Sequence, residues 1–235
     1  MHILQSILLV APVLLFSVIA HEIAHGYAAL RQGDRTALDA GRLSWNPARH
    51  IDPFLTILLP LMTIAGSMAA GARPFVFGGA KPVPVDPRNY RSLRLGDIVV
   101  SLAGVATNAV IAVACVALIA VTGLLGRAVP PLASSLAILQ AMLYFGVWIN
   151  AVLIAFNLLP IPPLDGSHVF KYLLPRALAI HYVRLARFGL LVLVLLLVWG
   201  ERVLNAWMYP AALASEWGLS LVASFFLPAA QQWIA

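Results

Sequence analysis

Long apolar stretches recur from one end of this sequence to the other, and most are long enough for a membrane-spanning helix, which takes about 20 residues. The convincing stretches are residues 3–30, 98–125, 136–159 and 188–203, and the weaker ones are 53–71 and 211–227. Only 10% of the residues are charged, whereas about 25% is usual for a soluble domain. The sequence therefore predicts an all-α polytopic membrane protein with about five to six transmembrane helices.

Two neighbouring segments depart from the helical pattern. The stretch 53–71 is apolar but contains Pro60 and Gly66, which interrupt helices. The stretch 73–97 is rich in Pro, Gly and Arg, and the alternation of Val with Pro in its KPVPV sequence is typical of an extended chain. We therefore expect a re-entrant or extended segment beside the transmembrane helices.

The C-terminal third is less regular. A basic linker is expected at 167–187, before the apolar stretch that begins at Phe188. Glu216 weakens the last apolar stretch, which is expected either to cross the membrane or to lie at its surface. We expect one domain over residues 1–235, with a core at 1–187 and C-terminal helices at 188–235.

The net charge of +6 is spread between the apolar stretches and does not form one block. Membrane topology requires this pattern, and no basic patch with interleaved aromatic residues indicates nucleic acid. The expected partner is thus the lipid bilayer, with no nucleic acid. The single cysteine, Cys115, lies within an apolar run and is expected to be a buried small hydrophobe.

Residues 21–25 read His-Glu-Ile-Ala-His, an HExxH motif near the end of the first apolar stretch. Side chains four apart lie on one face of a helix, so His21 and His25 can bind one zinc ion. Glu22 is displaced around the helix, where it can take a proton from the attacking water. A chance match and a purely structural role are the alternatives, but ionisable side chains are costly in a membrane span and indicate function there.

A catalytic zinc site needs a third protein ligand and an open position. Most of the nine acidic residues and six histidines lie in polar loops. Asp165 instead lies at the membrane end of an apolar stretch, beside Gly166, whose missing side chain permits close approach of backbone or metal. His168 is the competing candidate, although an interfacial histidine that binds nothing is the preferred interpretation of that residue.

The two motifs together resemble the site-2 protease family of intramembrane metalloproteases, which pairs HExxH with a distant NxxPxPxLDG. Residues 157–166 read NLLPIPPLDG and match every fixed position of the second motif. The resemblance implies that Asp165 is the third ligand of one Zn2+ ion per chain. It also implies that Asn157 helps to hold the substrate backbone.

The resemblance extends to HIDP at 50–53, AKPVPVDPRNYR at 80–91 and SLAGVATN at 101–108. These features look like the compact bacterial branch of the family, without PDZ or CBS modules. Many members have AGPxxN where this chain has Val105 in place of the proline, which leaves the local helix geometry open.

The zinc hypothesis restricts the topology. For HExxH and LDG to meet at one depth, the two helices that carry them must run in the same direction, so the segment 53–71 must be re-entrant or be returned by the extended chain after it. With that return, thirteen of the fifteen Lys and Arg residues lie on one side of the membrane, which the positive-inside rule makes the cytoplasmic side. We therefore expect an integral protein of a bacterial inner membrane, with the N-terminus outside and the active site towards the cytoplasm.

Four residues are expected to contact substrate: Asn157, Asn108, Val83 and Val85. A substrate helix must unwind before hydrolysis, and the extended chain around Val83 and Val85 can pair with the unwound strand by β-addition. A plain structural loop is the alternative. Asn108 lies in mid-span and needs a hydrogen-bonding partner, either in the active site or on a neighbouring helix.

These features predict an intramembrane zinc metalloprotease that hydrolyses peptide bonds in or near transmembrane helices of membrane protein substrates, with Glu22 as its catalytic residue. The alternative is a non-hydrolytic zinc-binding membrane transporter or an inactive scaffold, for which a glutamate at this spacing has no use. The sequence indicates neither the natural substrate nor the oligomeric state.

Overall fold

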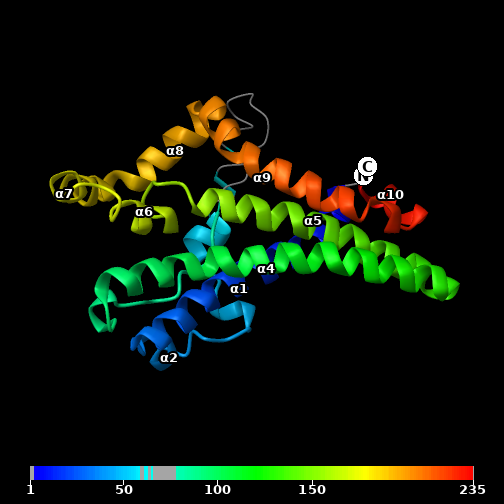
Figure 1. Ribbon diagram of the computed structural model, residues 1–235, viewed down its shortest axis with the longest axis horizontal. Coiled ribbons are helices and arrows are strands. Elements are labelled where there is room, and N and C mark those ends of the chain that lie inside the picture. Colours follow the sequence, from blue (N-terminus) through cyan, green and yellow to red (C-terminus); the bar gives the residue numbers. More distant parts are fainter. Residues whose placement is uncertain (1–2, 59–60, 63–64, 66–77, 235) are drawn as a thin grey trace.

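The computed structural model describes residues 3–58, 61–62, 65 and 78–234. Three long helices lie side by side at its centre: α1 (Ile3–Gln32), α4 (Leu93–Ala128) and α5 (Ala133–Asn157) (Figure 1). Each of the three contacts the other two. The short turn η4 (Pro130–Leu132) joins α4 to α5, so these two helices are antiparallel neighbours.

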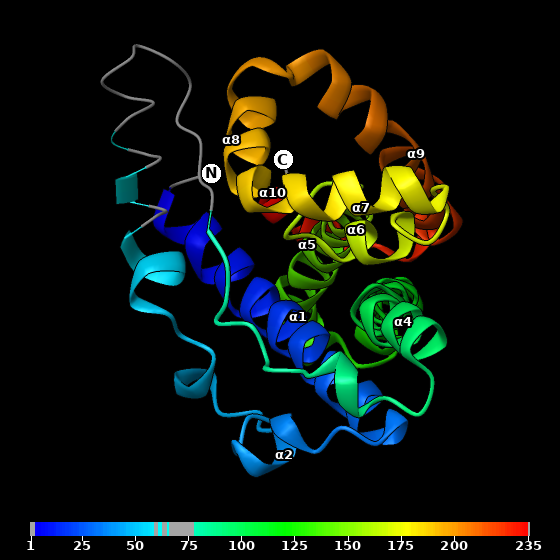
Figure 2. The same ribbon diagram turned by 90° about the vertical axis from the view of Figure 1, so that its left-hand side faces the viewer.

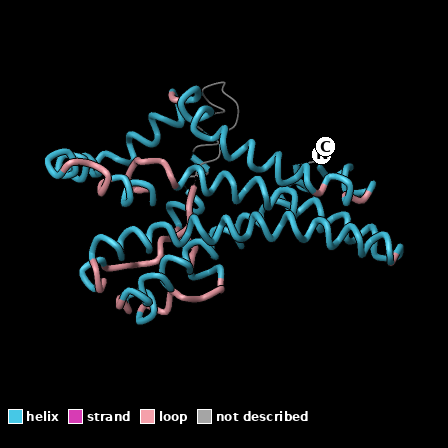
Figure 3. Tube along the Cα trace, in the orientation of Figure 1, coloured by secondary structure: helices cyan, strands magenta, loops and turns pink. Residues whose placement is uncertain are grey.

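The outward faces of this bundle are apolar. On α4, the side chains of Val110 and Val113 are 69% and 70% exposed. In the described part of the chain, four helical segments are long and apolar enough to cross a membrane: Leu8–Gln32, Leu93–Ala128, Pro130–Asn157 and Arg176–Trp199. The described residues contain no strand (Figure 3). The predicted all-α polytopic membrane class is therefore confirmed.

Small residues bring the central helices into close contact. A Cβ at Gly146 of α5 would lie 2.8 Å from the Sγ of Cys115 of α4, so no larger residue fits there without a shift. Cys115 is buried, as predicted. Close contact of this kind matters in a membrane, because lipid is as apolar as the side chains and burial alone does not hold helices together.

After α5 the chain continues as a series of shorter helices: α6 (Asp165–Phe170), α7 (Arg176–Leu185), α8 (Gly189–Trp199), α9 (Glu201–Leu221) and α10 (Gln231–Ile234). The turns η5 (Ala186–Phe188), η6 (Ala223–Phe225) and η7 (Pro228–Ala230) connect them. α9 packs along α5, as Figures 1 and 2 show.

Two expected boundaries in this region were wrong. The stretch 167–187, expected as a linker, contains most of α6 and all of α7. The apolar helix expected to run from Phe188 to Val203 ends at Trp199, and a new helix starts at Glu201. Gly200 lies at this break, where a Cβ would meet the carbonyl oxygen of Leu196 at 2.5 Å.

The chain between α1 and α4 is mostly irregular. It contains α2 (Thr36–Asp39), the turns η1 (Pro47–Arg49) and η3 (Pro87–Asn89), and the π-helical turn η2 (Pro53–Leu58). Residues 78–86 form no helix, as the KPVPV sequence predicted, and they run beside α1 (Figure 2).

Much of the segment 53–71, expected to be re-entrant, lies outside the described residues. The chain on either side of residues 57–78, however, comes together. The Thr56 hydroxyl donates to the Gly79 carbonyl at 2.7 Å, and the Lys81 N–H donates to the His50 carbonyl at 2.8 Å. The described residues on the two sides of that segment therefore lie close together, and the re-entrant course of the segment itself stays a prediction.

Candidate active site

The two histidines of HExxH lie on one face of α1 and point the same way. Their rings meet edge to face, with 4.6 Å between centroids. His21 is buried and His25 half-buried. The helical spacing of the motif therefore gives the geometry that the sequence predicted, with both imidazoles available to one ion.

Asp165 lies against these histidines although it is 144 residues further along the chain than His21. It is the first residue of α6, after a turn that reverses the chain beyond α5. A Cβ at Gly166 would collide with the carbonyl group of Leu158, so glycine allows α6 to pack directly against the end of α5. The predicted close approach at Gly166 is thus one of backbone to backbone.

The three ligand atoms fit a zinc ion. Oδ2 of Asp165 lies 3.1 Å from Nε2 of His21 and 3.4 Å from Nε2 of His25. Two ligand atoms about 2.0–2.1 Å from a tetrahedral zinc lie about 3.3 Å apart, and imidazole nitrogen with carboxylate oxygen is a usual zinc donor set. Among the described residues, His21, His25 and Asp165 form the only group of three or more His, Cys, Asp or Glu side chains close enough to hold a metal.

The second nitrogen of His25 fixes its ring. Nδ1 of His25 donates to the carbonyl oxygen of Val100 on α4 at 2.7 Å, which leaves Nε2 free to act as a ligand. Metal-binding histidines typically donate their other ring N–H in this way.

The protonation state of Asp165 also suits a ligand. Burial would raise the pKa of the Asp165 carboxyl, but the hydrogen bonds and the charges of His21 and His25 lower this pKa well below its usual value. The group is therefore ionised, as metal binding requires.

The competing candidate, His168, lies elsewhere. Its Nδ1 lies 3.2 Å from Oδ1 of Asp97, a buried carboxylate of α4. Asp97 also accepts from Lys171 at 2.5 Å and from the hydroxyl of Tyr172 at 3.0 Å. Three side chains in or just after α6 thus hold this helix, and with it Asp165, against α4. Sequence reasoning missed this cluster, because Asp97 is distant in sequence from its partners.

Glu22 is not one of the three clustered ligands. It is half-buried, and its Oε2 accepts a hydrogen bond from the backbone N–H of Val83 at 2.8 Å. Val83 lies in the extended segment 78–86, between Pro82 and Pro84, which have no N–H to donate. The extended segment therefore holds the candidate base beside the two histidines.

A second carboxylate holds this extended segment in place. Asp34, just after α1, is fully buried and accepts hydrogen bonds from Thr36, from the N–H of Asp86 and from the amide of Asn89. Burial would raise the pKa of Asp34, but these hydrogen bonds lower it. No sequence motif identified this anchor, since its partners lie about 50 residues further along the chain.

Gly104 makes room for the first histidine. A Cβ at this position would lie 2.6 Å from Nε2 of His21. The residue belongs to the AGV sequence in which Val105 replaces the proline of the family pattern. α4 is continuous through Val105, so the altered sequence causes no break in the helix.

The four residues expected to contact substrate differ in what they contact. The Asn157 amide donates to the Leu153 carbonyl of its own helix at 2.9 Å. Asn108 is completely buried, and neither atom of its amide has a hydrogen-bond partner in the described part of the chain. The backbone N–H of Val83 already donates to Glu22. Val85 makes no backbone hydrogen bond within the described residues. Their roles in substrate binding stay predictions.

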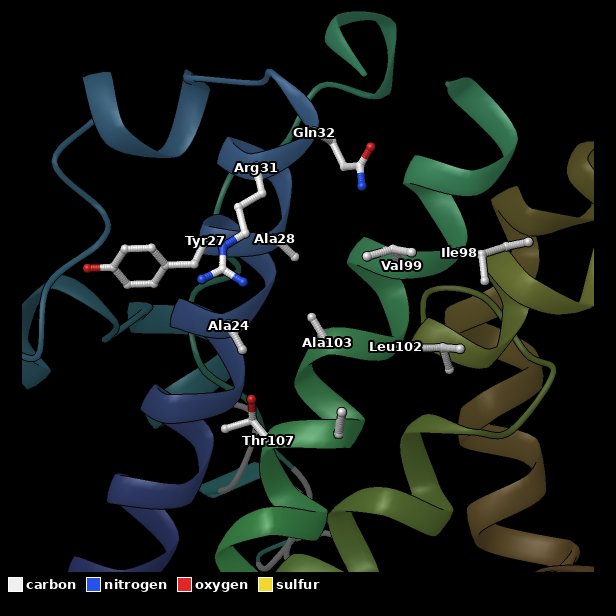
Figure 4. Close-up of a pocket in the computed structure, with 11 residues that line it drawn as sticks. Ala24, Tyr27, Ala28, Arg31, Gln32, Ile98, Val99, Leu102, Ala103 and Thr107 are labelled. Atoms are coloured by element: carbon white, nitrogen blue, oxygen red, sulfur yellow. The ribbon is translucent and has the colours of Figure 1, made fainter. Parts of the chain in front are cut away.

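A groove of about 630 Å³ runs between α1 and α4 (Figure 4). Its walls include the small residues Ala24, Ala28 and Ala103, and the Arg31 side chain lies along α1 near Tyr27 (Figure 4). It contains none of the three ligands and not Glu22. Ala24, which lies within HExxH, is however one of its lining residues, so the groove lies beside the candidate site.

A bundle of apolar helices that joins an HExxH helix to a distant aspartate defines the class of membrane-embedded zinc metalloproteases. Comparison with known proteins leads to the same class. The model of peptidase family M50 matches residues 9–199. YwhC of Bacillus subtilis strain 168, a zinc metalloprotease by name, is 36% identical over 189 residues, which cover 79% of this chain and 78% of YwhC.

A second relative is Rip2 of Mycolicibacterium smegmatis, also a zinc metalloprotease by name, which is 32% identical over 199 residues. They cover 83% of this chain and 68% of Rip2. No solved structure matches the chain. The protein belongs to peptidase family M50, the site-2 protease family, and is an integral membrane zinc metalloprotease.

Proposed function

We propose that this protein hydrolyses peptide bonds in or near transmembrane helices of other membrane proteins. The observation that carries the proposal is the position of the site. His21, Glu22 and His25 all lie within Leu8–Gln32, a segment long and apolar enough to cross a membrane. A soluble polypeptide has no access to that depth, whereas a membrane-embedded substrate reaches it within the bilayer.

One zinc ion per chain is held, in this proposal, by Nε2 of His21, Nε2 of His25 and a carboxylate oxygen of Asp165. Zinc bound there would polarise the scissile carbonyl group and lower the pKa of water towards neutrality. The distances between the three ligand atoms support this assignment.

Glu22 acts as the general base and acid. Its carboxylate takes a proton from the attacking water and later returns that proton to the leaving amide nitrogen. The N–H of Val83 orients the carboxylate, since it donates to Oε2. Asp34 supports this contact indirectly, because it holds the extended segment that contains Val83.

The unwound substrate pairs with the extended segment, in which Val83 and Val85 line the site. The N–H of Val85 is the donor left for a substrate carbonyl, since Val83 already donates to Glu22. β-Addition of this kind uses main-chain hydrogen bonds for affinity. Asn157, at the end of α5, contributes to holding the substrate backbone.

The chain works as one domain, residues 1–235, with a core at 1–187 and the helices of 188–235 packed beside it. It lies in a bacterial inner membrane with the active site towards the cytoplasm. The distribution of Lys and Arg supports this orientation. The charge count assumes that the segment 53–71 returns to the side from which it starts, and the contact between Thr56 and Gly79 supports that assumption.

Zinc binding without hydrolysis, as in a transporter or an inactive scaffold, is the competing function. The experiment compares wild type with Glu22→Gln in reconstituted membranes that contain a model transmembrane substrate. We expect the variant to retain bound zinc and to cleave about 10²- to 10⁴-fold more slowly, because it lacks the general base. Glu216→Gln, an exposed position on α9, is the matched control and should cleave normally. Full cleavage by Glu22→Gln would disprove the mechanism.

A further inference from the structure

A buried polar cluster lies where α1, α4 and α5 meet. Ser17, Asn108 and Asn150 are 0% exposed, and His21 is 6% exposed. Four polar atoms in this cluster have no hydrogen-bond partner in the described part of the chain: Nδ1 of His21, Nδ2 and Oδ1 of Asn108, and Oδ1 of Asn150. Unsatisfied polar atoms are costly within a membrane and need an explanation.

The register between the helices shows that these atoms are neighbours. α1 and α4 are antiparallel, since His25 contacts Val100 and the His21 ring contacts Gly104. Asn108 follows one turn after Gly104 and so lies level with the turn of α1 that precedes His21. That turn contains Ser17, whose hydroxyl accepts from the Asn150 amide at 2.9 Å.

The side chains of His21 and Asn108 lean towards each other. A side chain on a helix leans towards the N-terminus of its own helix. On α1 this direction takes the His21 ring towards the level of Asn108. On the antiparallel α4 it takes the Asn108 amide back towards His21.

The four unpaired atoms also match as donors and acceptors. With Nε2 as a zinc ligand, Nδ1 of His21 carries a proton and is a donor. Oδ1 of Asn108 is an acceptor, Nδ2 of Asn108 is a donor, and Oδ1 of Asn150 is an acceptor. One hydrogen bond from His21 to Asn108 and one from Asn108 to Asn150 would satisfy all four. Asn150 is already held by Ser17 and by the carbonyl of Gly146.

We propose that Asn108 is a positioning residue for zinc: its Oδ1 accepts the N–H of His21 Nδ1, and its Nδ2 donates to Oδ1 of Asn150. His21 thereby gains the partner that Val100 provides for His25. The inference rests on the proposed ligand set of His21, His25 and Asp165. It replaces a substrate contact as the role of Asn108, because a fully buried amide has no surface to offer a substrate.

The test is the zinc affinity of the purified full-length chain in nanodiscs, measured by competition with a chromophoric chelator. Asn108→Leu should bind zinc about 10- to 100-fold more weakly, the usual effect of losing an outer partner of a histidine ligand. Asn108→Asp keeps an acceptor oxygen and should stay within about threefold of wild type. Thr122→Val is the matched control, since it removes a buried hydroxyl from α4 about four turns away, and should leave affinity unchanged.

A second measurement separates positioning from folding. Unfolded fraction against denaturant, recorded after removal of metal, should show that Asn108→Leu is still folded in the absence of denaturant, so that its weaker zinc binding reports the lost hydrogen bond to His21 and not an unfolded chain. Zinc affinity of Asn108→Leu equal to that of Thr122→Val would overturn the inference, and so would equal weakening by Asn108→Leu and Asn108→Asp. Asp165→Ala tests the ligand set itself. Undiminished affinity in that variant would overturn the proposed site and this inference together.

Discussion

Two fully buried amides in the same helical bundle differ completely in their hydrogen bonds. Gln140 of α5 donates to the carbonyls of Ile119 and Phe225, each at 3.0 Å, and accepts from the N–H of Leu227 at 2.8 Å. Asn108 of α4, equally buried, makes no hydrogen bond within the described residues.

The contrast separates structure from function. Gln140 joins α4 and α5 to the C-terminal turns, and each of its partners is satisfied, so its contribution is to the stability of the fold. The unpaired atoms of Asn108 accompany an unpaired ring nitrogen of His21, a candidate metal ligand. A satisfied buried amide indicates a scaffold, and an unsatisfied one beside a reactive group indicates a site.

The largest expected effect comes from filling the space beside His21. Gly104→Ala would place a Cβ 2.6 Å from Nε2 of His21, so the ring must shift from the position in which it lies 3.1 Å from Asp165. We expect zinc affinity to fall at least about 100-fold, with loss of cleavage. Gly79→Ala is the control, because a Cβ there meets no atom within 4 Å. Normal zinc binding by Gly104→Ala would show that the ring is not confined as described.

Gln140→Leu tests whether Gln140 contributes to the stability of the fold and not to the metal site. This substitution leaves the buried Leu227 N–H without its acceptor and takes a donor from the Phe225 carbonyl, while the Ile119 carbonyl still accepts from the Thr122 hydroxyl. We expect the free energy of unfolding to fall by about 2–3 kcal/mol, while zinc affinity stays unchanged. Denaturant titration of both metal-loaded and metal-free protein measures the first quantity, and chelator competition the second. Weakened zinc binding in Gln140→Leu would remove the distinction between the two amides.

The third prediction concerns Asp97, whose carboxylate is paired with side chains in and just after α6. It tests whether this cluster affects both the stability of the fold and the affinity for zinc. Asp97→Asn loses the ion pair with Lys171 that holds α6, and hence Asp165, against α4. We expect zinc affinity to fall about 10-fold, together with a lower unfolding midpoint. Asp39→Asn, at an exposed carboxylate on α2, serves as control and should change neither quantity. An effect of Asp97→Asn on stability alone would limit this cluster to the fold.

The smallest effect concerns Asp34 and depends on pH. Because the folded-state pKa of Asp34 is lowered, its contribution to stability is present above the unfolded pKa of about 3.9 and is lost as pH falls through the folded value. Asp34→Asn should therefore be less stable than wild type by about 1 kcal/mol at pH 7, and the difference should shrink below about pH 4. Unfolding midpoints at several pH values measure this; a difference that does not depend on pH would contradict the assigned anchor.

Much of the fold and the site could be predicted because each rests on local rules. Apolar runs of membrane length predicted the central helices, and the spacing of HExxH predicted that His21 and His25 share a face. The family pattern added Asp165, which the structure places 3.1 Å from His21. The boundary between α8 and α9 was missed because the prediction extended the apolar stretch past Gly200 to Val203 and did not use the glycine as a helix stop.

The sequence by itself determined the membrane class, the metal-binding residue types and the candidate base, since length, hydropathy and helical periodicity are properties of neighbouring residues. Only the tertiary structure decided which groups orient those residues: the Val83 N–H on Glu22, Asp97 on α6, Gly104 beside His21, and the unpaired amide of Asn108. These contacts join segments far apart in the chain. They arise from how the helices pack, and no short-range pattern encodes that packing.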